Sequence, residues 1–537
     1  MNIRLCIIVI MVLQAFAFAQ EEAWVYLADK PGATEALQNP ITILTQQAIN
    51  RKVAQGVAID VRDVPVSEDY IAQIKAQPGI MVLAKSKWFN SLYVSGMQSS
   101  IEALGALPFV ASVHFANHNL DRQGRAASPN DKFELEETLV DFNYGSAQNQ
   151  VEMLNLNVLH EQDFTGNGIV IAVLDAGFPN VNTMGAFQRM RDNNRLLDGY
   201  DFVNRTNDIY AYTGSNHGTK VLSTMSGYIP DSYVGTAPDA SYYLFRTENA
   251  AIESPVEESY WVEAAERADS LGVHIINTSL GYNTFDNPNY DYTVNEMDGN
   301  TTFISRGANI AAEKGILVVG SAGNLGNNIW QIVSAPADSD GVFTIGAVDE
   351  AGNYAWFSSR GSSVQPTHKP DVVAMGLGAA VINENNNIVY NNGTSFSSPI
   401  IAGAMACLMQ ALPGTDINQL KQLVRMSASQ YQTPDYFLGF GIPDFATALN
   451  SALSVQEQVD DSIKFYPNPV IDMLYIHHFG VSQNVLINIF DLTGKLVLHK
   501  ENSASNIPFD VSGLVTGIYF MEIKTGIRTH VFKLIKI

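Results

Sequence analysis

Cysteine and positive charge are both scarce in this chain, and each shortage excludes a class of protein. The chain has 537 residues and only two cysteines, Cys6 and Cys407. Because Cys6 lies in a segment expected to be removed, Cys407 has no intrachain partner and a disulfide framework is excluded. Lys and Arg number 31 against 54 Asp and Glu, which gives a formal net charge of -23. This acidity argues against a nucleic-acid partner, since phosphate binding needs a basic surface.

Long apolar runs are also absent, so no membrane span is predicted. Near the N-terminus, Arg4 precedes a short apolar run over Leu5–Leu13, and Ala17 and Ala19 follow it. This order is typical of a signal peptide over residues 1–19 that is cut after Ala19. The alternative, a membrane anchor, needs a longer run. The sequence therefore predicts a secreted protein.

The sequence predicts a small α+β module over residues 20–118, the first part of the mature chain. Apolar alternation and helical periodicity predict its elements. The expected strands are 24–27, 80–84, 92–94 and 109–115, and the expected helices are 69–76 and 98–107. The polar, charged residues 119–142 then have the composition of a linker.

Residues 143–452 alternate near-continuous apolar strands with helical patterns. The expected strands include 169–174, 274–277, 316–320 and 342–348, and the expected helices include 262–271 and 304–314. This pattern predicts an α/β domain with a mostly parallel sheet covered by helices on both faces.

The end of the chain has a different pattern. Residues 453–462 form a second polar linker, and residues 463–537 show short alternating runs that predict an all-β sandwich. The expected strands are 474–476, 485–490, 495–498, 519–523 and 531–535, with a hairpin turn at Thr493–Gly494.

Three motifs in the α/β segment could together activate a serine hydroxyl. A hydroxyl is a weak nucleophile unless an imidazole takes its proton and a carboxylate orients that imidazole. Asp175 follows the strand 169–174, where sites lie in open α/β sheets. His217 precedes Gly218 and Thr219 at the start of a helical pattern. Taken alone, the motif at Asp175 is compatible with an ordinary turn, and the motif at His217 is compatible with a structural histidine.

The third motif is Asn392-Gly-Thr-Ser395-Phe-Ser-Ser-Pro399, which leads into an apolar helix. Ser395 would lie at the helix N-terminus, where free N–H groups favour a developing oxyanion. The alternative is a plain serine cap. Asn324 ends another strand-like run, and its amide could donate to the oxyanion; alternatively, it occupies a left-handed turn.

The order Asp, His, Ser with these flanking residues resembles the subtilisin family. Further matching strings lie at 235–240, 277–281, 357–361 and 369–371. The resemblance implies that Asp175 orients His217, that His217 is the general base, that Ser395 attacks and that Asn324 holds the oxyanion. It also implies that Ser279, Leu280 and Gly281 pair with the substrate backbone.

The chain departs from the family pattern at two positions and in the unusual loop Phe178–Met190. Ala176 stands where the family has Ser or Thr, and Lys220 replaces a common second histidine. Neither change removes a member of the triad. These departures therefore bear on substrate preference more than on activity.

The flanking segments also carry resemblances. Residues 20–118 resemble the inhibitory propeptides of subtilisin-like enzymes, which implies cleavage within 119–142; the alternative is a permanent accessory domain. Residues 463–537 resemble the C-terminal sorting domain of type IX secretion cargo in the Bacteroidetes, through strings such as Phe465-Tyr-Pro-Asn-Pro469 and the ending Lys533–Ile537. The alternative is a carbohydrate-binding or adhesion module.

The sequence thus predicts a secreted serine endopeptidase, made as an autoinhibited zymogen and exported through the periplasm of a Gram-negative bacterium. Its expected partners are polypeptide substrates, its own propeptide and the type IX machinery. The alternatives are a catalytically inactive surface protein on this scaffold and a serine esterase, which commonly carries a Gly-x-Ser-x-Gly elbow that Ser395 lacks.

No cofactor is required for this chemistry. Structural calcium is compatible with Asp286, Asn287 and Asp291, although a solvated loop explains these residues as well because no regular ligand spacing is visible.

Overall fold

The structure is a computed structural model that describes residues 20–121, 145–453, 463–478, 485–491, 495–502, 506–525 and 528–537. The chain divides into two compact units, Met1–Ala452 and Leu453–Ile537. The predicted signal peptide, most of both predicted linkers and the turn at Thr493–Gly494 lie outside the described residues.

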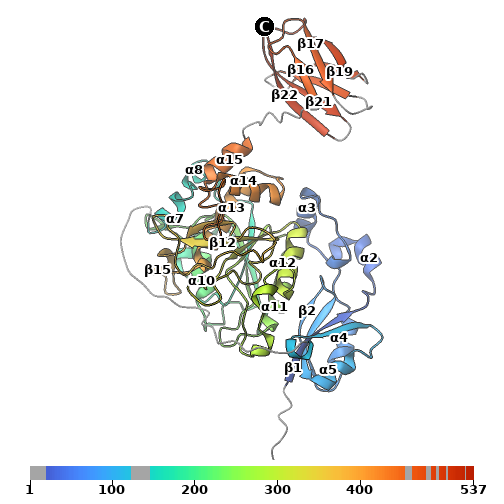
Figure 1. Cartoon of the computed structure of the whole chain (residues 1–537), viewed down its shortest axis with the longest axis vertical. Helices are drawn as coiled ribbons and strands as arrows, with labels where there is room; N and C mark the ends of the chain where they lie inside the picture. The colour runs from blue at the N-terminus through green and yellow to red at the C-terminus, as the bar shows by residue number, and fades with distance from the viewer. Residues whose placement is uncertain are drawn as a thin grey trace, which may run out of the picture. The chain divides into compact units, whose positions relative to one another are not determined.

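The N-terminal domain of the first unit is a four-stranded antiparallel sheet in the order β2-β3-β1-β4 (Figure 1). Its strands are β1 (Gln20–Leu27), β2 (Ile80–Ser86), β3 (Ser91–Met97) and β4 (Val110–Phe115). The helices α4 (Glu68–Lys75) and α5 (Gln98–Leu104) cover one face. Successive side chains of β1 point to opposite faces of the sheet. Val25 therefore packs in the core with these helices, and Trp24 lies on the other face. The predicted α+β module is confirmed.

A segment between β1 and α4 has short helices that the sequence analysis did not predict. It contains α2 (Ala33–Gln38), η1 (Pro40–Thr42), α3 (Gln46–Ala54) and η2 (Val61–Asp63). We call residues 28–66 the arm. Only α3 is longer than two turns, and no residue of α2 is buried, so these helices lack the long apolar periodicity that predicts helices from sequence. After β4, α6 (His118–Asp121) ends the described part of this domain.

The α/β domain is built on a seven-stranded parallel sheet in the order β13-β12-β11-β10-β5-β9-β6. The strands are β5 (Val170–Asp175), β6 (Leu196–Asp201), β9 (Ser241–Arg246), β10 (Ile275–Thr278), β11 (Leu317–Ser321), β12 (Val342–Val348) and β13 (Val372–Met375). Every residue of β5, β10, β11, β12 and β13 is buried, as expected for strands covered on both sides.

Helices cover both faces of this sheet, which confirms the predicted fold class. On one face lie α10 (His217–Ser226) and α13 (Thr394–Ala411), and on the other lie α11 (Val256–Leu271) and α12 (Phe303–Glu313). The helix α11 begins six residues before the predicted start, because its first turn carries two buried glutamates that weaken the apolar pattern.

The remaining elements of this domain surround the sheet. They are α7 (Gln148–Glu152), α8 (Asn157–His160), η3 (Gly185–Phe187), α9 (Gln188–Asp192), β7 (Tyr228–Ile229), β8 (Tyr233–Val234), η4 (Pro288–Tyr290), η5 (Val294–Glu296), β14 (Ala379–Ile382), β15 (Ile388–Asn391), α14 (Ile417–Ser427) and α15 (Phe445–Leu453). The free thiol of Cys407 is buried in α13 and donates to the carbonyl oxygen of Thr236 at 3.2 Å, as a core residue would.

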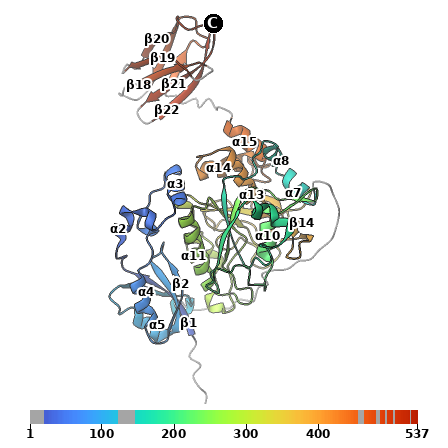
Figure 2. The same ribbon diagram turned by 180° about the vertical axis from the view of Figure 1, so that it is seen from behind.

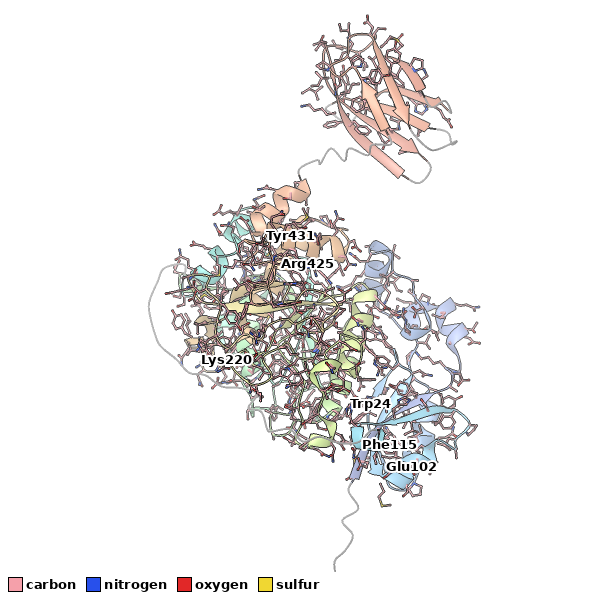
Figure 3. The ribbon with its side chains drawn as sticks, viewed as in Figure 1. Trp24, Glu102, Phe115, Lys220, Arg425 and Tyr431 are labelled. Carbon is pink, nitrogen blue, oxygen red and sulfur yellow. The ribbon has the colours of Figure 1, made fainter. Side chains whose placement is uncertain are left out.

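The N-terminal domain packs on α11 and α12 through its open sheet face, as both views show (Figures 1 and 2). The indole of Trp24 donates to Ser259 Oγ at 3.1 Å and stacks on Phe303 with ring centroids 5.0 Å apart (Figure 3). The Glu266 carboxylate accepts from Ser86 Oγ at 2.5 Å and from the Trp88 N–H at 2.9 Å. Burial of this carboxyl raises its pKa to about 7.

The second unit consists of two antiparallel sheets, in the orders β16-β17-β20 and β19-β18-β21-β22, around one apolar core. Its strands are β16 (Ile463–Tyr466), β17 (Met473–His478), β18 (Val485–Phe490), β19 (Leu496–Asn502), β20 (Asn506–Asp510), β21 (Gly517–Thr525) and β22 (Arg528–Lys536). The predicted all-β architecture is confirmed.

Candidate active site

Asp175 is the last residue of β5, at the carboxyl edge of the parallel sheet. Its side chain is fully buried, and its Oδ1 accepts the Ala176 N–H at 2.7 Å. The Thr247 N–H, just after the neighbouring strand β9, donates to the backbone carbonyl of Asp175 at 3.1 Å. The backbone of Asp175 is therefore held by the next strand, and its carboxylate is held by the Ala176 N–H.

His217 begins α10 and faces this carboxylate. Its Nδ1 donates to Asp175 Oδ1 across 2.7 Å, and its side chain is 12% exposed. Gly218 makes this approach possible, because a Cβ there would lie 2.5 Å from the Gly177 carbonyl oxygen and 2.7 Å from the Phe178 ring. A glycine at 218 thus permits the close approach of the two backbone segments.

The helix α13 begins at Thr394, directly after Gly393, which has a φ of 150°. Ser395 is the second residue of this helix. Its side chain is nearly buried, and Oγ donates to the Ser279 carbonyl oxygen at 3.4 Å. The next residue, Phe396, places its ring 5.9 Å from the His217 ring between centroids. At this end of the helix the Thr394 N–H donates to Asn324 Oδ1 and the Phe396 N–H donates to the Gly393 carbonyl at 3.1 Å, so the Ser395 N–H is the donor of this turn that can serve an anion.

Asn324 follows β11 and is held against the start of α13. Its Oδ1 accepts the Thr394 N–H at 2.9 Å and the Thr394 hydroxyl at 3.0 Å. Because Oδ1 accepts from Thr394, the amide nitrogen Nδ2 points to Gly393. A Cβ added to Gly393 would lie 3.6 Å from this nitrogen. An amide N–H₂ aimed this way can donate to a group bound beside Ser395.

One cleft brings these motifs together. It has a volume of about 1020 Å³, and His217, Ser395 and Asn324 all line it. The other walls come from loops at 213–216, 249–253, 356–357 and 391–393. The last two overlap the string 357–361 and the motif that begins at Asn392. The first two carry no shared motif, so no signal in the sequence points to them. Lys220 on α10 also lines the cleft (Figure 3).

Ser279, Leu280 and Gly281 follow β10 and lie next to the start of α13. Ser279 is engaged on both sides, because its Oγ donates to the Ser395 carbonyl at 2.9 Å and its own carbonyl accepts from Ser395. Within the described part of the chain, none of the three is among the residues that line the cleft. Their pairing with substrate stays a prediction.

Arg246, at the end of β9, supports the site and was missed by sequence reasoning. Its Nε donates to the Ala176 carbonyl at 3.1 Å, and its Nη1 donates to Asp201 Oδ2 at 2.9 Å. The Tyr212 ring, from the loop before His217, lies over the guanidinium at 3.4 Å. A lone arginine at a strand end has no sequence signature, although it links the turn after Asp175 to that loop.

The residues considered for calcium all accept hydrogen bonds from backbone N–H groups. Asp286 accepts the Glu253 N–H at 3.1 Å, Asn287 accepts the Asn289 N–H at 3.2 Å, and Asp291 accepts the Phe285 N–H at 2.7 Å. Among the residues that the structure describes, no group of three or more His, Cys, Asp or Glu side chains is arranged to hold a metal ion. Structural calcium stays a prediction.

Comparison with known protein families gives three matches along the chain. Residues 166–441 match the subtilase family of S8 peptidases, residues 22–132 match a peptidase S8 propeptide domain of the Bacteroidota, and residues 464–537 match a secretion system C-terminal sorting domain.

Curated relatives resemble the α/β domain. Subtilisin DY of Bacillus licheniformis is 26% identical over 289 residues, which cover 53% of this chain and 93% of that protein. A thermostable alkaline protease of Halalkalibacterium halodurans is 27% identical over 292 residues, which cover 53% of this chain and 69% of that protein.

A solved structure shows the same fold. A variant of the epidermin leader peptide processing serine protease EpiP from Staphylococcus aureus superposes with a TM-score of 0.54 at 16% identity, over 81% of this chain and all of that chain.

The fold and these matches define a serine-type endopeptidase with an N-terminal propeptide and a C-terminal sorting domain. The chain belongs to the subtilase family, whose match covers just over half of its 537 residues. The sorting domain identifies a secreted or cell-surface protein of the Bacteroidetes. In the described ranges, no helix has both the length and the hydropathy needed to cross a membrane.

Proposed function

We propose that Asp175, His217 and Ser395 form the catalytic triad of this secreted endopeptidase, which hydrolyses peptide bonds through an acyl-enzyme. One observation carries the proposal. The buried Asp175 carboxylate holds His217 Nδ1 at 2.7 Å, and the other side of that imidazole belongs to the cleft that Ser395 also lines. A carboxylate on Nδ1 favours the tautomer in which Nε2 carries no proton and can accept one.

The reaction begins when Ser395 Oγ attacks the scissile carbonyl carbon and His217 Nε2 takes the hydroxyl proton. The Asp175 carboxylate stabilises the imidazolium that forms. The tetrahedral intermediate collapses when the C–N bond breaks and His217 returns the proton to the leaving amine. A water molecule then attacks the acyl-enzyme by the same route, releasing the acid and restoring the hydroxyl.

Asn324 is the proposed side-chain donor to the oxyanion. Its oxygen is tied to Thr394, so its nitrogen is already oriented before substrate binds. Preorganised donors of this kind stabilise the transition state without a reorganisation cost. The segment 279–281 is proposed to pair with the substrate backbone as an added strand.

The flanking regions define how the enzyme is made and exported. We propose that residues 1–19 direct passage through the inner membrane and that residues 463–537 direct export from the periplasm across the outer membrane. Residues 20–118 then act as an inhibitory propeptide on the catalytic domain 143–452, and cleavage within 119–142 releases the active enzyme. The packing of the N-terminal domain on α11 and α12 supports this arrangement.

The test is active-site labelling of the processed protein with a fluorophosphonate probe, followed by casein digestion. The wild type is expected to take the label on Ser395 and to digest casein, and Ser395→Ala is expected to do neither. Ser363→Ala, at an exposed serine outside the cleft, is the matched control and should behave as the wild type. Casein digestion by Ser395→Ala, or no label on processed wild type, refutes the proposal and favours an inactive scaffold.

A further inference from the structure

The arm of the N-terminal domain contacts the catalytic domain next to the place where the turn between β2 and β3 contacts it through Lys87 and Ser270. In both views α3 lies at the end of α11 and α12 opposite to α4 and α5 (Figures 1 and 2). Its contacts there are at the C-terminal ends of both helices, since the Thr45 N–H donates to the Ser270 carbonyl at 3.0 Å. The arm therefore makes a second contact, which adjoins that of the sheet at Ser270.

A chain of buried charges crosses this contact. Asp269 Oδ1, on α11, lies 2.5 Å from Arg51 Nη2 and 2.8 Å from Lys52 Nζ. The same Lys52 Nζ lies 3.1 Å from Asp63 Oδ1. Asp63 in turn holds Lys314, at the end of α12, at 2.8 Å. All five side chains are at most 2% exposed. The charges alternate in sign from Arg51 to Lys314. Asp269 and Lys314 belong to the catalytic domain, and the other three side chains belong to the arm.

The arm also completes the ends of the two helices. Arg51 Nη1 donates to the carbonyl oxygens of Lys314 and Gly315 at 2.8 and 2.7 Å. Helix C-termini carry unpaired carbonyls and partial negative charge, which a guanidinium satisfies. At the end of α11, Gly272 has a φ of 84°, and a Cβ there would meet the Ala48 backbone nitrogen at 2.7 Å. The two surfaces therefore fit closely as well as matching in charge.

Asp269 and Lys314 have no comparable role within the catalytic domain. Among the described residues, the side-chain partners of Asp269 are Arg51 and Lys52, and those of Lys314 are Asp60 and Asp63, all from the N-terminal domain. The Lys52 and Lys314 charges hold the pKa of Asp63 below its ordinary value even though burial acts to raise it. A buried charge without its partner is strongly unfavourable, so such a set selects a matching partner rather than adding much net stability.

We propose that the C-terminal ends of α11 and α12 form a second docking site, selective by charge, for the arm of this protein's own N-terminal domain. The site holds the arm through contacts that lie outside the cleft. It also rejects N-terminal domains that lack the matching charges. The inference uses the proposed function only in treating residues 20–118 as a separable propeptide.

The test is hydrogen exchange by mass spectrometry on the full-length Ser395→Ala protein, which cannot process itself. Asp269→Asn leaves Arg51 and Lys52 without their carboxylate, so exchange of the α3 amides should accelerate at least about a hundredfold. Adding Lys52→Met to Asp269→Asn restores the charge balance and should bring exchange back to within about tenfold of the parent. Glu313→Gln is the matched control, because its pair with Arg62 is exposed, and it should change exchange by less than about threefold.

Two results would overturn the docking site: α3 exchange in Asp269→Asn equal to that of the parent, or no recovery in the double variant. If Asp269→Asn also accelerates amide exchange in α11, the single variant Lys52→Met, which changes only the arm, is measured in its place. Unchanged exchange of the α3 amides in Lys52→Met refutes the site. Because the protein under test is inactive, these results do not depend on proteolysis. A wild type that fails to take the fluorophosphonate label would refute the proposed function and leave this site standing.

Discussion

At the scale of single residues, Asp175 shows how the chain departs from its family. Its Oδ1 is held by Ala176 and His217, while Oδ2 is buried without a hydrogen-bond partner among the described residues. Ala176 offers an N–H but no hydroxyl. The orientation of the carboxylate therefore depends on one oxygen and on the backbone around it.

Asn324 provides a direct test of the proposed oxyanion site. Asn324→Ala should lower kcat about 10²–10³-fold with little change in KM, because the amide acts on charge that develops only in the transition state. Asn324→Asp is the matched variant, since it keeps an oxygen to accept from Thr394 and removes the donor. Steady-state kinetics on a peptide substrate measure both. Full activity in Asn324→Asp would exclude the side chain as the donor.

Arg246 is expected to matter for stability as well as for activity. Arg246→Met leaves the buried Asp201 carboxylate without its guanidinium, which should lower the unfolding free energy by about 3–5 kcal/mol. Adding Asp201→Asn removes the orphan charge and should recover part of that loss. Urea unfolding of the Ser395→Ala form measures the effect. Equal stabilities for Arg246→Met and its parent would show that this pair is not needed.

At the scale of elements, the packing of α13 places Ser395. Gly403 lies where α13 contacts residues 236–237, and a Cβ there would lie 2.0 Å from Thr236 Oγ1 and 3.2 Å from the Ala237 nitrogen. A side chain at this position must therefore displace the helix that carries the serine.

Gly403→Ala is accordingly expected to lower the unfolding free energy by about 1–3 kcal/mol through overpacking. Gly281→Ala is the matched control, because its Cβ would meet its nearest atom at 3.5 Å, an ordinary contact. Thermal unfolding of both variants in the Ser395→Ala background gives the comparison. A Gly403→Ala protein as stable as its control would mean that the helix can shift at no cost.

At the scale of the whole molecule, buried carboxyls make the stability of the first unit depend on pH. Burial raises the pKa of Glu258 to about 8, and its Oε1 has no hydrogen-bond partner among the described residues. Tyr292 donates to its other oxygen at 3.0 Å. A carboxyl whose pKa is raised on folding favours the folded state below its unfolded pKa, near 4.5, and loses that contribution as pH rises through about 8.

The melting temperature of the Ser395→Ala protein should therefore fall as pH rises from about 5 to about 9. Glu258→Gln cannot ionise, so its melting temperature should fall less steeply over the same range. Scanning calorimetry at each pH measures the two slopes. Parallel slopes would contradict the assignment of this dependence to Glu258.

Much of the architecture could be predicted because its signals are local. The buried strands of the parallel sheet read as continuous apolar runs, and the motifs around Asp175, His217 and Ser395 are contiguous in sequence. The arm was not predicted, since α3 buries Arg51 and Lys52 where an isolated helix would expose them. Those side chains are buried because Asp269 of α11, the carbonyls after α12 and Asp63 of the arm supply their partners.

By itself, the sequence determined the fold class, the order of the segments and the three residues proposed for the chemistry, because strand patterns and short motifs depend on neighbouring residues. Only the tertiary structure decided which loops wall the cleft, that Arg246 supports the turn after Asp175, and that Asp269 and Lys314 face the arm. Each of these depends on groups that are distant in the chain and meet only when the core is packed, and no local pattern records such a meeting.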